Sequence, residues 1–126
     1  MKTAQDLVMA AKATIKEVSV ADADGVIHNA EIVIDVREPA EYEQGHLSGA
    51  INIPRGLLEF KIGGMPALES RDTNIVIYCK TSGRAALAAA SLAEMGYLNV
   101  TSIAGGYDGW VEAGKPVVTQ NLPEFG

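Results

Sequence analysis

Apolar residues follow two different spacings along the chain, and together these spacings predict alternating strands and helices. Continuous runs of mainly β-branched residues at 32–36 and 74–78 are typical of strands that are buried on both faces. Shorter stretches with strand character lie at 15–20, 50–53 and 100–103. The pattern therefore predicts a sheet of five short strands.

Helices are predicted between these strands. Thr3 and Asp6 resemble a capping box in front of an amphipathic segment. Pro39 suits the first turn of another helix, and Gly45 suits its C′ position. The predicted helices span 1–14, 39–43, 84–95 and 108–112.

Strands that alternate with helices indicate right-handed crossovers and a parallel sheet. We therefore predict an α/β fold, a three-layer sandwich in which helices flank a central parallel five-stranded sheet. Residues 1–126 are interpreted as a single domain with a C-terminal tail at 118–126, because this length leaves little room for a second domain. Residues 21–29 are predicted to form a loop or a helical turn. The sequence leaves the conformation of 55–72 open.

Composition restricts the classes of function. Hydrophobic residues make up 48% of the chain and charged residues 21%, as in an ordinary globular domain. The net charge of −6 provides no basic surface, so no nucleic acid or membrane partner is predicted. One cysteine cannot form an internal disulfide, and the polar first residues do not resemble a signal peptide. A cytoplasmic, reducing location is therefore predicted.

The candidate chemistry is concentrated at Cys79, which directly follows one buried strand and precedes a helix. The short connection between them contains small, polar and basic residues: Lys80, Thr81, Ser82, Gly83 and Arg84. Backbone N–H groups in such a loop form a nest for anions, and the helix N-terminus adds partial positive charge. These neighbours would stabilise a thiolate and any negative sulfur bound to it. We therefore interpret Cys79 as a reactive cysteine.

Three motifs, in this order, resemble the signatures of the rhodanese sulfurtransferase superfamily, and of its single-domain members in particular. The first motif is IDVRE at 34–38 with GHLSGAINIP at 45–54. The second is the loop CKTSGR at 79–84, which resembles the active-site loop of the family. The third is GGYDGW at 105–110, followed by GKP at 114–116.

This resemblance implies a rhodanese-like domain and a sulfurtransferase mechanism. The Cys79 thiolate would take a sulfane sulfur from thiosulfate or a similar donor and carry it as a persulfide. A thiol or cyanide would then accept the sulfur. The implied partners are a small-molecule sulfur donor and a thiol acceptor, including a protein thiol. No metal or organic cofactor is implied.

Several other residues have expected roles near Cys79. Loop residues 80–84 are expected to bind the donor and the persulfide. Arg55 and Asp35 follow or end strands and are candidate substrate contacts, although a structural ion pair with Arg37 is the preferred interpretation of Asp35. His46 is interpreted as structural, because a thiolate that is held by a nest needs no general base.

Two other functions stay open. A sulfur-carrier or interaction module that turns over little thiosulfate would use the same Cys79. A phosphatase or arsenate reductase is disfavoured, because those enzymes close a longer loop around a tetrahedral oxyanion. Here only four residues separate Cys79 from Arg84, and this smaller ring suits a single sulfur atom.

Overall fold

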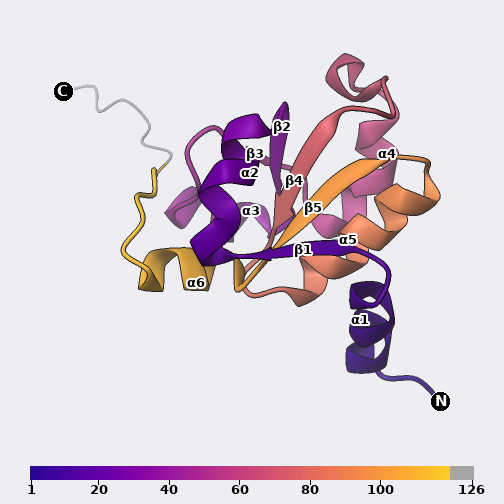
Figure 1. The fold of residues 1–126 in the computed structure, drawn as a ribbon, viewed down its shortest axis with the longest axis horizontal. Coiled ribbons are helices and arrows are strands. Elements are labelled where there is room, and N and C mark those ends of the chain that lie inside the picture. Colours follow the sequence, from indigo (N-terminus) through magenta and orange to yellow (C-terminus); the bar gives the residue numbers. More distant parts are fainter. Residues whose placement is uncertain (120–126) are drawn as a thin grey trace.

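The computed structural model describes residues 1–119, so 120–126 of the predicted C-terminal tail lie outside the described residues. A single parallel sheet has the strand order β1-β5-β4-β2-β3 (Figure 1). Its strands are β1 (Lys16–Ser19), β2 (Ile32–Asp35), β3 (Ile51–Asn52), β4 (Asn74–Tyr78) and β5 (Asn99–Ala104). The predicted parallel five-stranded sheet is confirmed.

Helices cover both faces of this sheet (Figure 1). They are α1 (Ala4–Lys12), α2 (Ala23–Asn29), α3 (Pro39–Gln44), α4 (Leu58–Ile62), α5 (Gly83–Glu94) and α6 (Gly106–Glu112). Three 3-10 turns accompany them: η1 (Val20–Asp22), η2 (Arg55–Leu57) and η3 (Pro66–Leu68). The predicted capping box is confirmed, since Thr3 Oγ1 accepts the N–H of Asp6 and the Asp6 carboxylate accepts the N–H of Thr3.

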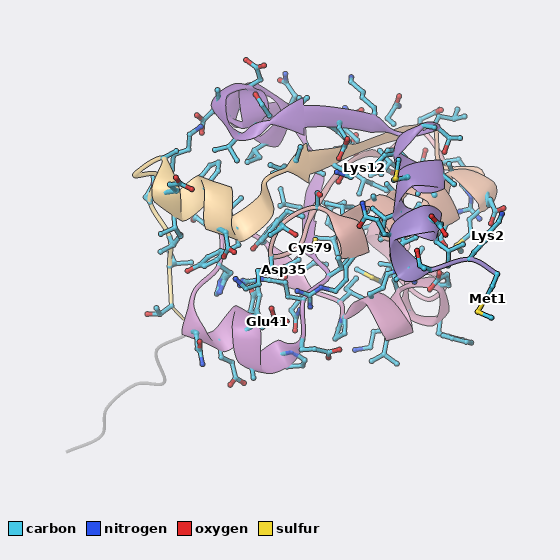
Figure 2. All side chains as sticks on the ribbon, turned by 90° about the horizontal axis from the view of Figure 1, so that it is seen from below. Met1, Lys2, Lys12, Asp35, Glu41 and Cys79 are labelled. Carbon is cyan, nitrogen blue, oxygen red and sulfur yellow. The ribbon has the colours of Figure 1, made fainter. Side chains whose placement is uncertain are left out.

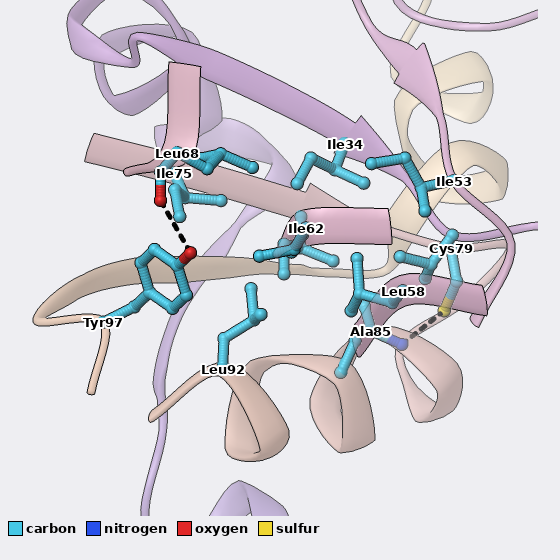
Figure 3. Packing of buried hydrophobic residues seen from close by; sticks show 13 residues of the cluster. Ile34, Ile53, Leu58, Ile62, Leu68, Ile75, Cys79, Ala85, Leu92 and Tyr97 are labelled. Atoms are coloured by element: carbon cyan, nitrogen blue, oxygen red, sulfur yellow. Dashed lines mark hydrogen bonds between the residues drawn. The ribbon is translucent and has the colours of Figure 1, made fainter. Parts of the chain in front are cut away.

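Alternate residues of β4 point into two separate cores, as expected for a strand covered on both faces. Ile75 and Ile77 face α4 and α5, whereas Val76 and Tyr78 face α2 and α6. We call the first cluster the first core: Ile34, Val36, Ile53, Leu58, Ile62, Leu68, Ile75, Ile77, Cys79, Ala85, Ala88, Leu92 and Tyr97. Figure 3 shows this packing. Cys79 continues the alternation, which directs its side chain toward α5.

Two connections carry more structure than their sequences indicate. Residues 21–29 form η1 and then the helix α2, because Ala23 is fully buried in the core on that face. Residues 55–72 contain η2, α4 and η3. There Leu58 and Leu68 are buried in the first core and anchor an otherwise irregular segment. Burial of a few apolar residues thus orders segments whose periodicity is weak.

Gly45 directly follows the last residue of α3, in agreement with its predicted place at the end of that helix. Its φ of 161° is extended. A Cβ atom here would overlap the hydroxyl group of Tyr107. The contact with the Tyr107 side chain on α6, rather than the turn, therefore favours glycine here.

No helix within residues 1–119 combines the length and the apolar character needed to cross a membrane.

Candidate active site

Cys79 lies at the carboxyl end of β4, immediately before the loop that leads into α5. Its side chain is almost fully buried, and Sγ accepts a hydrogen bond from the N–H of Ala85 at 3.3 Å (Figure 3). Ala85 belongs to the first turn of α5, so the sulfur sits at the positive end of a twelve-residue helix. On its other side the sulfur adjoins apolar residues of the first core. This environment is suited to a sulfur anion shielded from water.

The strand order explains which elements surround the loop. In the sheet, β4 lies between β5 and β2, so the segments that follow those strands meet at the same edge. These segments are the start of α6, after β5, and α3, after β2. In Figure 2, Cys79 lies near the centre of the molecule, and Glu41 on α3 appears below it. The loop is therefore flanked by α6 and α3.

The start of α6 fixes the orientation of the loop backbone. The N–H of Tyr107 donates to the carbonyl of Cys79 at 2.8 Å, and the N–H of Asp108 donates to the carbonyl of Lys80 at 3.0 Å. In a trans peptide the C=O and the next N–H point in opposite directions. The N–H groups of Lys80 and Thr81 are therefore directed away from α6.

These loop N–H groups have the properties of an anion nest. Within residues 1–119, no protein acceptor takes the N–H groups of the five residues 80–84. Sγ of Cys79 itself accepts only the N–H of Ala85 among the described residues. The remaining donors are therefore available to a group carried on the sulfur or approaching it.

Gly106 lets α6 approach the loop this closely. With a φ of +54°, a Cβ here would come within 3.0 Å of the carbonyl oxygens of Cys79, Lys80 and Thr81. No side chain fits into that space. Gly106 therefore permits the hydrogen bonds that orient the loop.

Both basic residues of the loop form ion pairs with carboxylates from the flanking helices. Lys80 Nζ lies 2.6 Å from Oδ2 of Asp108. Arg84 donates from both of its terminal nitrogens to Glu41, at 2.8 and 3.1 Å. The hydrogen bond from Arg84 lowers the pKa of Glu41 to about 2, and the same bond raises the pKa of Arg84. At neutral pH both partners of this pair are charged.

The N-terminal helix α1 also reaches the loop. Lys12 Nζ donates to Oγ of Ser82 at 2.8 Å and lies 3.5 Å from the carboxylate of Glu17. A Cβ built on Gly83 would be 3.5 Å from a methyl group of Val8. Figure 2 shows Lys12 on this helix. The last part of the loop is thus supported by an element that is distant in sequence.

Asp35 lies at the end of β2 in a buried ion pair. Its carboxylate accepts hydrogen bonds from the backbone N–H of Arg37 at 2.9 Å and from its guanidinium at 2.7–3.1 Å. Burial opposes the charge of Arg37, but the bond and charge of Asp35 outweigh it, so the pKa of Arg37 is raised. Asp35 is fully buried, in agreement with the structural interpretation. A substrate would have to displace this pair to contact it.

Arg55 and His46 are held by neighbours outside the loop. The guanidinium of Arg55 binds Glu59 at 2.9 and 3.0 Å and Oγ of Ser91 at 3.2 Å, and none of its hydrogen bonds in the described part of the chain involves the loop. His46 stacks on Tyr42 with ring centroids 3.7 Å apart. Its backbone also pairs with Val118. His46 is therefore a packing residue in the structure. The hydrogen bonds of Arg55 among residues 1–119 go to Glu59 and Ser91 and not to Cys79.

A cavity of about 260 Å³ lies beside the loop, between α3 and α6. It is lined by Arg37, Glu41, Gln44, Lys80, Tyr107 and Asp108. A larger cavity of about 520 Å³ lies at the amino-terminal ends of β4 and β5, whereas Cys79 lies at the carboxyl end of β4. Size alone therefore does not indicate the site of chemistry.

Several residues around the loop were not found from the sequence. Glu41 had a detectable signal, because Glu38 and Glu41 form a capping box at the start of α3. Gly106 lies within the GGYDGW motif, but its contact with the loop has no local signature. Lys12 and Asp108 meet their partners only through the fold.

Comparison with known proteins identifies the family. The model of the Rhodanese-like domain matches residues 16–113. That range is well over half of the chain, so the chain belongs to the rhodanese-like domain family. The helix α1 lies before the matched residues.

Two sulfurtransferases and one solved structure are similar to this chain. A sulfurtransferase of Allochromatium vinosum is 33% identical over 87 residues, which cover 69% of this chain and 78% of the relative. The thiosulfate sulfurtransferase PspE of Escherichia coli is 40% identical over 76 residues, covering 60% of this chain and 71% of the relative. A solved structure from Rhodopseudomonas palustris, a protein of unknown function described as a possible tyrosine phosphatase, superposes with a TM-score of 0.85. It is 30% identical and covers 94% of this chain and 96% of its own.

Proposed function

We propose that this protein is a sulfurtransferase that carries a sulfane sulfur as a persulfide on Cys79. The donor is thiosulfate or a similar compound, and the acceptor is a thiol or cyanide. One observation carries the proposal: Cys79 Sγ is buried and accepts the Ala85 N–H at the N-terminus of α5, and the N–H groups of the loop that follows Cys79 have no protein acceptor in residues 1–119. Kinship with sulfurtransferases supports sulfur transfer in general. We place the reaction in the cytoplasm, where a single thiol stays reduced.

The proposed reaction uses the Cys79 thiolate as the nucleophile and the loop N–H groups to stabilise the negative charge on the transferred sulfur. The Cys79 thiolate attacks the outer sulfur of thiosulfate, the S–S bond of the donor breaks, and sulfite leaves with the electron pair. The persulfide then places a second, negatively charged sulfur among the loop N–H groups. Attack by an acceptor thiolate on this outer sulfur forms the acceptor persulfide and returns the Cys79 thiolate.

Intact-mass analysis tests the persulfide directly. We expect incubation with thiosulfate to add the mass of one sulfur atom to the protein, and cyanide to remove it. The Cys79→Ala variant, treated identically, controls for sulfur bound elsewhere. An unmodified wild-type protein after treatment with thiosulfate and with an organic persulfide would refute the proposal. Stoichiometric loading with slow turnover would instead identify a sulfur carrier.

The phosphatase alternative is tested in the same preparation. The relative from Rhodopseudomonas palustris is described as a possible tyrosine phosphatase, so p-nitrophenyl phosphate is the relevant substrate. We propose that the ring closed by four residues between Cys79 and Arg84 is too small for phosphate. Hydrolysis that disappears in Cys79→Ser would contradict the ring-size argument and favour a phosphatase.

A further prediction concerns the support that α1 gives to the loop. We expect Lys12→Met to slow persulfide formation by up to about fivefold, because a charged hydrogen bond to Ser82 is lost at a partly exposed site. The methionine retains most of the apolar stem. Lys2→Met, which removes an exposed lysine ahead of α1, is the matched control. Equal rates in the two variants would show that Lys12 does not support the reaction.

A further inference from the structure

The two basic side chains of the persulfide loop do not offer unpaired charge to a substrate. Lys80 is paired with Asp108 at 2.6 Å, and Arg84 is paired through two hydrogen bonds with Glu41. Together these four side chains have no net charge. The loop resembles an anion site in sequence, but carboxylates from the flanking helices balance the charge of its two basic side chains.

Both carboxylates are held in place by the elements that flank the loop. Glu41 Oε1 accepts the backbone N–H of Glu38 at 3.0 Å, so its position is fixed by the first turn of α3. Asp108 lies in the first turn of α6, and its own N–H binds the carbonyl of Lys80. Glu41 and Asp108 also line the cavity of about 260 Å³ beside the loop. The neutralisation is therefore built into the scaffold.

The paired carboxylates weaken the attraction of the loop for a donor by an amount that depends on the charge of the donor. Thiosulfate carries two negative charges, whereas the persulfide of an uncharged thiol carries at most one. Two unpaired cations would attract the dianion more strongly, but carboxylates at short distance cancel most of that attraction. The loop N–H groups remain, and they serve a single anionic sulfur equally well from either donor.

We propose that Glu41 and Asp108 are specificity-determining residues that make the loop favour a singly charged organic persulfide over doubly charged thiosulfate as the sulfur donor. This inference rests on the proposed sulfurtransferase function and names its donor class. In the transfer, the Cys79 thiolate attacks the outer sulfur of the donor anion R–S–S⁻, the donor S–S bond breaks, and RS⁻ leaves with the electron pair. The outer sulfur keeps its negative charge on Cys79, so charge balances and no oxidant or reductant is consumed.

The first experiment measures the charge at Cys79 without any sulfur transfer. Alkylation by anionic iodoacetate is compared with alkylation by neutral iodoacetamide, and the ratio of the two rates is followed. We expect Glu41→Gln to raise this ratio about three- to tenfold at low salt, and we expect salt to reduce the gain. Glutamine can still accept the N–H of Glu38, so the capping box is retained. Asp108→Asn should act in the same direction but less, because its pair is more exposed.

The matched control is Glu43→Gln. Glu43 lies on the same helix and is exposed, so this variant changes the net charge equally without touching Arg84. We expect its alkylation ratio to equal that of the wild type within about twofold. If Glu41→Gln gives the same ratio as Glu43→Gln, the electrostatic argument is wrong.

The second experiment compares donors by kcat/KM, with thiosulfate and with the hydropersulfide of 2-mercaptoethanol. We expect the wild type to prefer the hydropersulfide, and Glu41→Gln to raise kcat/KM for thiosulfate about threefold or more while the hydropersulfide value stays within about twofold. A wild type that uses thiosulfate more efficiently would overturn the inference. If neither donor loads Cys79, the sulfurtransferase proposal itself fails, whereas the alkylation ratio still decides the charge argument independently.

Discussion

Replacing Cys79 by serine is expected to abolish sulfur transfer while the protein stays folded. The hydroxyl group of serine can accept the N–H of Ala85 in place of Sγ, so the hydrogen bond at the start of α5 can persist. An alcohol at neutral pH is a far weaker nucleophile than a thiolate, and within residues 1–119 the hydrogen-bond partner of this position is a backbone N–H rather than a base that could activate it. Initial rates with thiosulfate and with an organic persulfide, read against a no-enzyme control, measure the effect.

A second variant separates chemistry from packing. Cys79→Ala removes both the nucleophile and the acceptor of the Ala85 N–H, so it should be less stable than Cys79→Ser by about 1 kcal/mol. Both variants should be equally inactive. Thermal unfolding of the two proteins checks the stability difference. Turnover above background in either purified variant would rule out Cys79 as the sulfur carrier.

Gly106→Ala should be the most damaging substitution outside the loop itself. The added methyl group would meet the carbonyl oxygens of Cys79, Lys80 and Thr81, so α6 and the loop must separate. The hydrogen bonds that orient the loop N–H groups would then be lost or lengthened. We expect sulfur transfer to fall at least about tenfold and stability to fall by about 2 kcal/mol or more. Rates of persulfide loading and thermal unfolding measure the two effects.

Gly114→Ala is the matched control for this substitution. Gly114 also has a positive φ, +75°, but a Cβ there would meet no atom within 4 Å. It therefore carries the backbone cost of a left-handed alanine, about 1–2 kcal/mol, without any contact with the loop. We expect Gly114→Ala to retain the wild-type transfer rate at temperatures well below unfolding. Equal losses of activity in the two variants would show that Gly106 has no special effect on the loop.

Local patterns predicted the fold, and they indicated Cys79 as the nucleophile of the proposed reaction. The β4 segment is a run of apolar residues with a loop and an alanine-rich helix behind it, and each feature is encoded within about fifteen residues of Cys79. The buried pair of Asp35 and Arg37 was also accessible, since the two residues are only two positions apart. Pairs of residues this close in the sequence can be predicted from the sequence alone.

The charge state of the loop was not accessible from the sequence. Lys80 and its partner are 28 positions apart, and Arg84 and its partner are 43 positions apart. Which carboxylates meet these cations depends on the order β5-β4-β2 in the sheet, and the alternation of strands and helices does not specify that order. From the sequence, Lys80 and Arg84 are expected to be available to an anion, whereas in the fold each of them is paired with a carboxylate.

The position of β1 also affects how the chain folds during synthesis. Among residues 1–119, β1 is an outermost strand of the sheet and pairs only with β5, and α1 packs against α5. The first nineteen residues thus have no native partner in the sheet until residue 104 has been made. At typical translation rates this interval is on the order of ten seconds. Residues 32–78 contain β2, β3 and β4, which are neighbours in the sheet, so we expect the N-terminal segment to join the sheet last during synthesis.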